Sequence, residues 1–119
     1  MQMHELAAWL GDDHGLTDGQ VDDLLTRADE IEARYVDPDD REEAQAALTV
    51  AYRLMVEDSG AVVAELAAAR VAARTAELAA LAGLRQAATQ LIPAGDRSEA
   101  GFAREGGVDR QAVRTWLGK

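Results

Sequence analysis

Positive charge gathers at the end of this chain, in side chains that could attract phosphate or donate hydrogen bonds. The last ten residues, Arg110 to Lys119, hold three basic side chains and no acidic one. The whole chain has a net charge of −10, and residues 1–59 hold 4 arginines against 16 acidic side chains. Residues 60–119 hold 8 basic and 6 acidic side chains, a net charge of +2. Phosphate attraction is therefore modest, and tight binding to a polyanion needs two copies of the basic segment.

The residues around this basic segment are spaced like two short helices that cross closely. Ala103 lies where the first helix must be thin, and Gly107, four residues later, suits a turn with a positive φ. The intervening turn is predicted to span three to four residues. Ser98 and Asp109 are predicted to cap the two helices. The inward-facing side chains are predicted to be Phe102, Val108, Val113, Trp116 and Leu117.

This spacing resembles the DNA-binding helix-turn-helix units of repressors, resolvases and small bacterial regulators. The resemblance covers about residues 85–119. Gly101 and Gly106 depart from the pattern, because each glycine inside the first helix costs about 1 kcal/mol relative to alanine. The resemblance implies double-stranded DNA as the partner. It also implies a regulator of transcription, or of plasmid or phage maintenance.

In such units the first turns of the second helix face the major groove. When the positions of such units are matched to this sequence, the resemblance implies this role for four residues of the second helix, with Asp109 at the helix start: Arg110, Gln111, Arg114 and Thr115. Arginine can bind guanine with two hydrogen bonds, glutamine can bind adenine, and threonine can touch the thymine methyl group. Ser98, Arg104 and Lys119 flank this helix and are candidates for phosphate contacts. The alternative is a solvated polar face on which Ser98 and Asp109 act only as caps.

The other polar residues predict neither an enzyme nor a metal or cofactor site. No grouping of serine, histidine and carboxylate suits nucleophilic catalysis, and no glycine-rich phosphate loop occurs. Cysteine is absent, which excludes disulfides and thiolate metal sites. Asp12-Asp13-His14 lacks EF-hand spacing, and the two histidines, ten residues apart, do not form a zinc pair on one helix face. A solvated acidic loop is the expectation.

Hydrophobic periodicity predicts an all-α fold without strands. Helices are expected over 1–10, 18–36, 38–58 and 61–91, with Gly11 as the first stop. Thr17 and Gln20 form a capping box before the second helix, and Asp37-Pro38 marks the start of the third. Ala44, Ala47, Leu48, Ala51, Leu54 and Met55 are the expected inward face of the third helix. Ser59-Gly60 marks a break before the fourth helix, or its N-cap.

The chain is expected to divide into an acidic helical region (1–59), an alanine-rich dimerisation helix (60–84) and the helix-turn-helix (85–119). Between Ala61 and Leu91, 13 of 31 residues are alanine. A narrow stripe along this helix could pack inside the chain or between two chains of a homodimer: Val62, Leu66, Ala69, Ala73, Ala76 and Ala80. The acidic region serves assembly in the preferred interpretation. In the alternative, the chain is a protein-interaction module whose acidic half binds a basic partner.

No segment approaches the about 20 continuous apolar residues that a membrane span requires. Met1–Leu10 also lacks the basic start and apolar core of a secretory signal. A cytoplasmic protein without a membrane segment is therefore expected.

Overall fold

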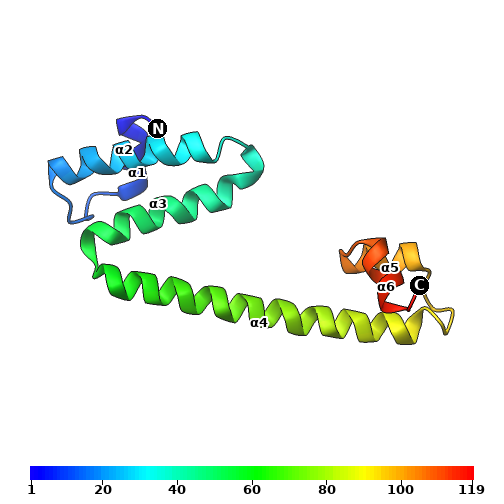
Figure 1. Cartoon of the computed structure of the whole chain (residues 1–119). Helices are drawn as coiled ribbons and strands as arrows, with labels where there is room; N and C mark the ends of the chain where they lie inside the picture. Colours follow the sequence, from blue (N-terminus) through cyan, green and yellow to red (C-terminus); the bar gives the residue numbers. More distant parts are fainter. The chain divides into compact units, whose positions relative to one another are not determined.

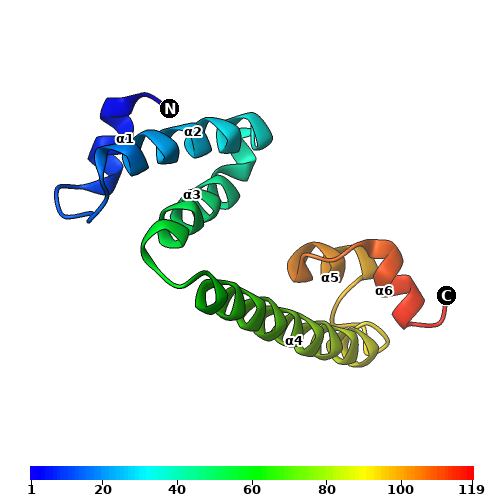
Figure 2. The same cartoon turned by 60° about the vertical axis from the view of Figure 1, so that its left-hand side comes forward.

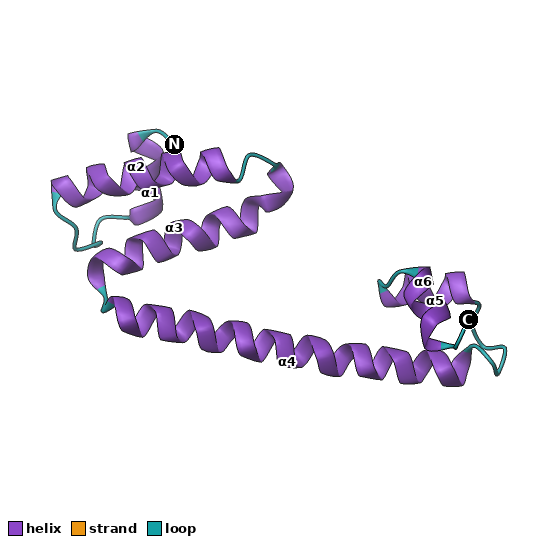
Figure 3. Ribbon diagram, in the orientation of Figure 1, coloured by secondary structure: helices purple, strands orange, loops and turns teal.

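The computed structural model describes all 119 residues and contains helices and loops but no strands (Figure 3). The expected all-α class is confirmed. In chain order (Figure 1), the helices are α1 (Met3–Leu10), α2 (Asp18–Arg34), the short 3-10 helix η1 (Pro38–Asp40), α3 (Arg41–Val56), α4 (Ser59–Leu91), α5 (Glu99–Gly106) and α6 (Arg110–Trp116). Residue contacts divide the chain into unit 1 (Met1–Ala67) and unit 2 (Ala68–Lys119), with the boundary inside α4.

No helix combines the length and the apolar character needed to cross a membrane.

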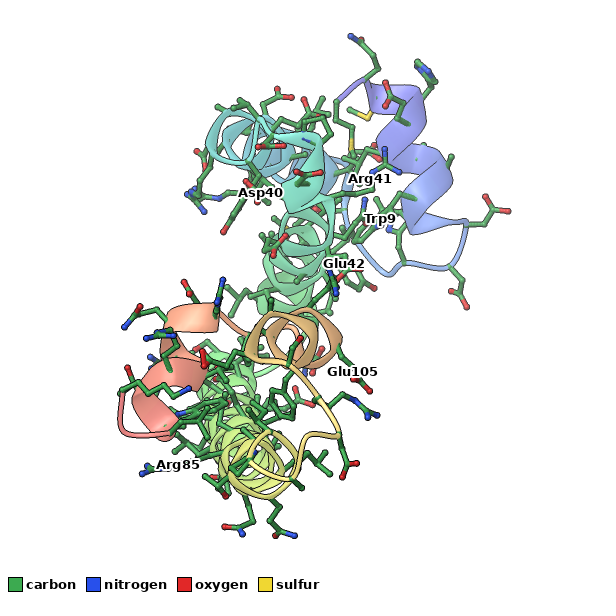
Figure 4. All side chains as sticks on the ribbon, turned by 90° about the vertical axis from the view of Figure 1, so that its right-hand side faces the viewer. Trp9, Asp40, Arg41, Glu42, Arg85 and Glu105 are labelled. Carbon is green, nitrogen blue, oxygen red and sulfur yellow. The ribbon has the colours of Figure 1, made fainter.

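Unit 1 is built on α2 and α3, which lie side by side (Figures 1 and 2). The buried core residues come from α1, α2 and α3: Leu6, Leu24, Ala28, Ile31 and Leu48. The Trp9 side chain points from α1 towards the other helices of the unit (Figure 4), and its ring meets Tyr52 edge-on with 6.3 Å between centroids. The Tyr52 hydroxyl donates to the backbone carbonyl of His14 at 2.7 Å, which fixes the acidic loop before α2.

The expected inward position of Leu54 is wrong, since this residue is 47% exposed. Leu54 lines an open groove between α2 and α3 together with Ile31, Ala47 and Ala51. The groove stays open because no other element of unit 1 covers this side of the two helices. The charged side chains along it are balanced, with Arg27 and Arg34 against Glu30 and Glu43.

Local signals set most helix ends in unit 1. Thr17 and Gln20 form the predicted capping box, and Gly11 ends α1 with a φ of 75°. The third predicted helix begins as η1, where Asp37 accepts a hydrogen bond from the Asp39 amide at 2.9 Å. Asp58, one residue before the predicted cap, accepts from the Ala61 amide at 2.8 Å. An aspartate carboxylate competes well with a serine hydroxyl for this role.

α4 is continuous from Ser59 to Leu91, because Gly83 neither ends nor interrupts it. Every residue from 63 to 80 is exposed in the single chain. Within the predicted stripe, Val62 is buried (1% exposed), whereas the members from Leu66 to Ala80 are open to solvent. At the start of α4, Glu65 forms an ion pair with Arg53 of α3, which also pairs with Glu57 at 2.7 Å.

Unit 2 packs α5 and α6 against the last turns of α4. Its buried core joins Ala88 of α4, Phe102 and Ala103 of α5, and Val113 of α6. Leu84, Leu91, Ile92, Val108, Trp116 and Leu117 surround this core and are partly buried. The predicted inward face of residues 99–117 is therefore confirmed. Alanine at 88 and 103 keeps the side-chain layer thin, so the helices approach closely.

The link between α5 and α6 is three residues long, Gly107 to Asp109. Gly107 adopts the left-handed conformation with a φ of 65°, and the amides of Gly107 and Val108 both donate to the Ala103 carbonyl. A residue with a Cβ atom is strained in this conformation. The predicted positive φ at this glycine is confirmed.

We expect Gly107→Ala to lower the free energy of unfolding by about 1–2 kcal/mol, because alanine must adopt a left-handed backbone. Gly83→Ala is the matched control. Gly83 lies in an exposed stretch of helix, where an added Cβ atom would meet no neighbouring atom within 4 Å. This control should raise stability by about 0.5–1 kcal/mol. Chemical unfolding followed by circular dichroism measures both. Equal effects of the two substitutions would contradict the role of the turn.

Candidate nucleic-acid interface

α6 has one buried side and one open side. Val113 is fully buried, and Trp116 is partly buried against the same core. Because α6 packs on this side, its first two residues, Arg110 and Gln111, are exposed. Neither side chain forms a hydrogen bond or an ion pair within the chain. Both can therefore donate hydrogen bonds to an external ligand.

Three of the other predicted site residues already bond to the backbone. Asp109 caps α6 by accepting from the Gln111 amide at 2.7 Å, and Ser98 caps α5 by accepting from the Gly101 amide at 3.0 Å. The Thr115 hydroxyl donates to the Gln111 carbonyl at 3.0 Å. The predicted capping roles of Ser98 and Asp109 are confirmed, and Thr115 offers mainly its methyl group to a ligand.

Two predicted site residues meet at a carboxylate that the sequence did not single out. Glu99, the first residue of α5, accepts from Arg114 Nη1 at 3.0 Å and from Lys119 Nζ at 2.6 Å. Its side chain is only 14% exposed, against 40% for Arg114 and 48% for Lys119. The hydrogen bond from Lys119, followed by the charge of both cations, holds the pKa of Glu99 below its ordinary value.

The remaining cations of unit 2 fall into a paired and an unpaired group. Arg97 pairs with Glu105 at 2.9 Å, and this contact raises the pKa of Arg97. Arg104 on α5 and Arg110 on α6 are exposed and form no ion pair, and the same holds for three arginines of α4: Arg70, Arg74 and Arg85. Figure 4 shows Arg85 and Glu105 pointing outward from unit 2. Among residues 97–119, Arg104 and Arg110 are therefore the cations that are free to meet a polyanion.

Comparisons of the chain with models of protein families, with curated proteins and with solved structures found no match.

Glu99 is the residue that sequence reasoning missed. At the start of a helix, an acidic residue is explained by the favourable dipole alone. Its partners lie 15 and 20 residues away, on and after α6, so no local spacing relates them. The available signal was the charge pattern, in which a single acid opens α5 while the residues after Asp109 carry only positive charges.

We expect Glu99→Gln to lower the midpoint of thermal unfolding at pH 7, because two ion pairs lose their carboxylate. The pKa of Glu99 is lowered from 4.5 in the folded chain, so its stabilisation is complete above that pH and is lost as the pH falls through the folded value. Thermal unfolding of both proteins between pH 7 and about pH 3 should therefore show a difference that shrinks in acid. Glu42→Gln, at an exposed residue of α3 without an ion pair, controls for the change in net charge. A difference that stays constant with pH would contradict the assignment.

Proposed function

We propose that this chain binds double-stranded DNA in a sequence-specific way through a helix-turn-helix formed by α5 and α6, as a homodimeric regulator of transcription. The observation that carries the proposal is the open side of α6. Arg110 and Gln111 are exposed there without partners, while Val113 anchors the opposite side in the core. In units of this kind, the N-terminal residues of the second helix contact base edges.

The chemistry of these two side chains suits major-groove recognition. A guanidinium can donate two hydrogen bonds to O6 and N7 of guanine, and a primary amide can both donate to and accept from adenine. Thr115, one turn further along the helix, brings a methyl group suited to thymine. Because Arg114 is engaged by Glu99, we assign direct base recognition to Arg110 and Gln111 before Arg114.

The other candidate residues fit supporting roles. Arg104 is exposed and unpaired on α5, which suits a phosphate contact beside the groove. Ser98 and Asp109 act through the backbone, because each holds the first turn of its helix in place. Contacts of this kind orient a protein on the duplex without selecting its sequence.

Two copies acting together would supply the affinity that one weakly basic unit lacks. The exposed length of α4 supports this part of the proposal, because Leu66 and the alanines of the stripe have no partner within the chain. A two-fold dimer would present its α6 helices to half-sites about 34 Å apart, one turn of the duplex.

The protein-interaction alternative rests on the acidic excess of residues 1–59 alone. Its basic partner would need an acidic docking surface, whereas the groove of unit 1 carries balanced charges. The acidic side chains of residues 1–59 come from α1, α2, η1 and α3 and from the loops between them.

We expect Arg110→Ala to weaken binding to a duplex selected from a random library by about 1–3 kcal/mol, because a two-bond contact to a base is lost. Fluorescence anisotropy with the selected duplex measures the change. Arg34→Ala, which removes an equal charge from exposed α2 of unit 1, is the matched control and should bind as the unmodified chain does. Equal binding by the Arg110 variant would argue against base recognition by α6.

The dimer is tested separately with Ala73→Glu in the stripe of α4. Both this alanine and Ala64, on the other side of the helix, are exposed in the single chain, so neither substitution should unfold it. If the stripe joins two chains, Ala73→Glu yields monomers in sedimentation analysis at concentrations where Ala64→Glu remains dimeric. Monomers for the unmodified chain would reject the dimer, and dissociation by Ala64→Glu alone would move the interface to the other face.

A further inference from the structure

Glu99 forms ion pairs with two cations of the candidate interface, Arg114 and Lys119. Its Oε2 accepts from Arg114 and its Oε1 accepts from Lys119, so both carboxylate oxygens are occupied. The backbone around it is fixed, because Ser98 caps the same helix turn. Glu99 is much less exposed than either cation. The three residues therefore form a compact cluster, the Glu99 clamp, on the side of unit 2 where α5 meets α6.

We propose that the Glu99 clamp withholds Arg114 and Lys119 from DNA phosphates and so keeps the sequence-independent affinity of the protein low. The proposal rests on the proposed function and adds a residue that controls it. Under this proposal Glu99 contacts no base. It controls what share of the binding free energy comes from phosphate contacts and what share comes from base contacts by Arg110 and Gln111.

Two additional cations matter because few cations around α5 and α6, in residues 97–119, are unpaired. Arg97 is already paired with Glu105, which leaves Arg104 and Arg110 as the unpaired cations between residues 97 and 119. Releasing Arg114 and Lys119 would double that number. Sequence-independent binding comes almost entirely from neutralised phosphates, so two additional cations change it strongly.

A phosphate cannot simply replace Glu99 as the partner of these cations. Taking one cation leaves the carboxylate with its other partner, and taking both leaves a largely covered carboxylate unpaired beside the DNA. The carboxylate and the phosphate are then like charges at close range, which disfavours the exchange. The clamp therefore holds against the duplex better than a single exposed ion pair would.

The consequence for a regulator is a low background. Every segment of a genome competes for a DNA-binding protein through its phosphates, and the ratio of specific to competing sites sets occupancy. A clamp that removes two phosphate contacts from each copy reduces this competition without changing the side chains that face the bases.

The test compares Glu99→Gln with the unmodified chain on a random-sequence duplex and on a selected duplex, over a range of salt concentrations. Release of two cations should steepen the slope of log affinity against log salt by about 1.8 per recognition unit. Affinity for the random duplex should rise about tenfold or more near 0.1 M salt. Glu42→Gln, with the same charge change at an exposed, unpaired residue of unit 1, should leave the slope unaltered.

A second set of variants ties the effect to the two cations. In a chain that carries both Arg114→Gln and Lys119→Gln, adding Glu99→Gln should no longer steepen the slope. Circular dichroism at the assay temperature establishes that each variant is folded. If the triple variant still shows a steeper slope, the effect does not pass through Arg114 and Lys119, and the proposal fails.

The remaining outcomes separate the clamp from the proposed function. An unmodified chain that binds no duplex at low salt rejects DNA binding itself. A chain that binds, but whose slope is unaffected by Glu99→Gln, rejects the clamp alone. A Glu99→Gln variant that loses affinity only for the selected duplex also rejects it, because Glu99 would then position Arg114 for a base contact.

Discussion

The close approach of α5 to α4 and α6 is the constraint on which unit 2 depends. Ala88 and Ala103 are the small side chains at this contact, and both are buried together with Phe102 and Val113. A larger side chain at either alanine would push the helices apart, because protein interiors leave little free volume. The orientation of α6, and hence of everything on its open side, follows from this thin contact.

Several cations of the chain are paired with nearby carboxylates in the folded structure. Arg53 is held between Glu57 and Glu65, which raises its pKa, and Arg97 is held by Glu105. Met1 donates from its amino group to Asp29 and Glu32 on α2, which raises the pKa of that group. Exposed pairs of this kind contribute little to stability one by one. Their larger effect is on which charges are left to act on other molecules.

The sequence predicts those parts of the fold that depend on neighbours along the chain. Thr17 with Gln20, Ser98 and Gly107 each specify a turn of backbone by hydrogen bonding or by steric freedom, and the structure confirms all of them. Leu54 is different, because periodicity shows which residues share a helix face but not whether another element covers it. The end of α2 at Arg34 rather than at Val36 is a difference of two residues, within the usual fraying of helix ends.

In the candidate site, too, the sequence predicts the features that depend on neighbours along the chain. The exposure of Arg110 and Gln111 follows from the burial of Val113, which lies three and two residues further along the same short helix. The ion pairs of Arg114 and Lys119 with Glu99 cannot be predicted in this way. They join side chains from separate elements through a carboxylate whose position depends on the packed fold. Pairings between distant charges depend on tertiary geometry, which a residue pattern does not contain.

The exposed middle of α4 has a consequence for how this protein can diverge. Residues 63–80 are open to solvent in the single chain, so their helical state depends mainly on intrinsic backbone preference, which alanine satisfies best. Substitution among alanine, glutamate, arginine and lysine would preserve the helix in the single chain, whereas proline would break it. The backbone of this stretch therefore tolerates wide substitution outside the stripe, whereas the proposed pairing of two chains restricts the stripe itself to small and apolar side chains.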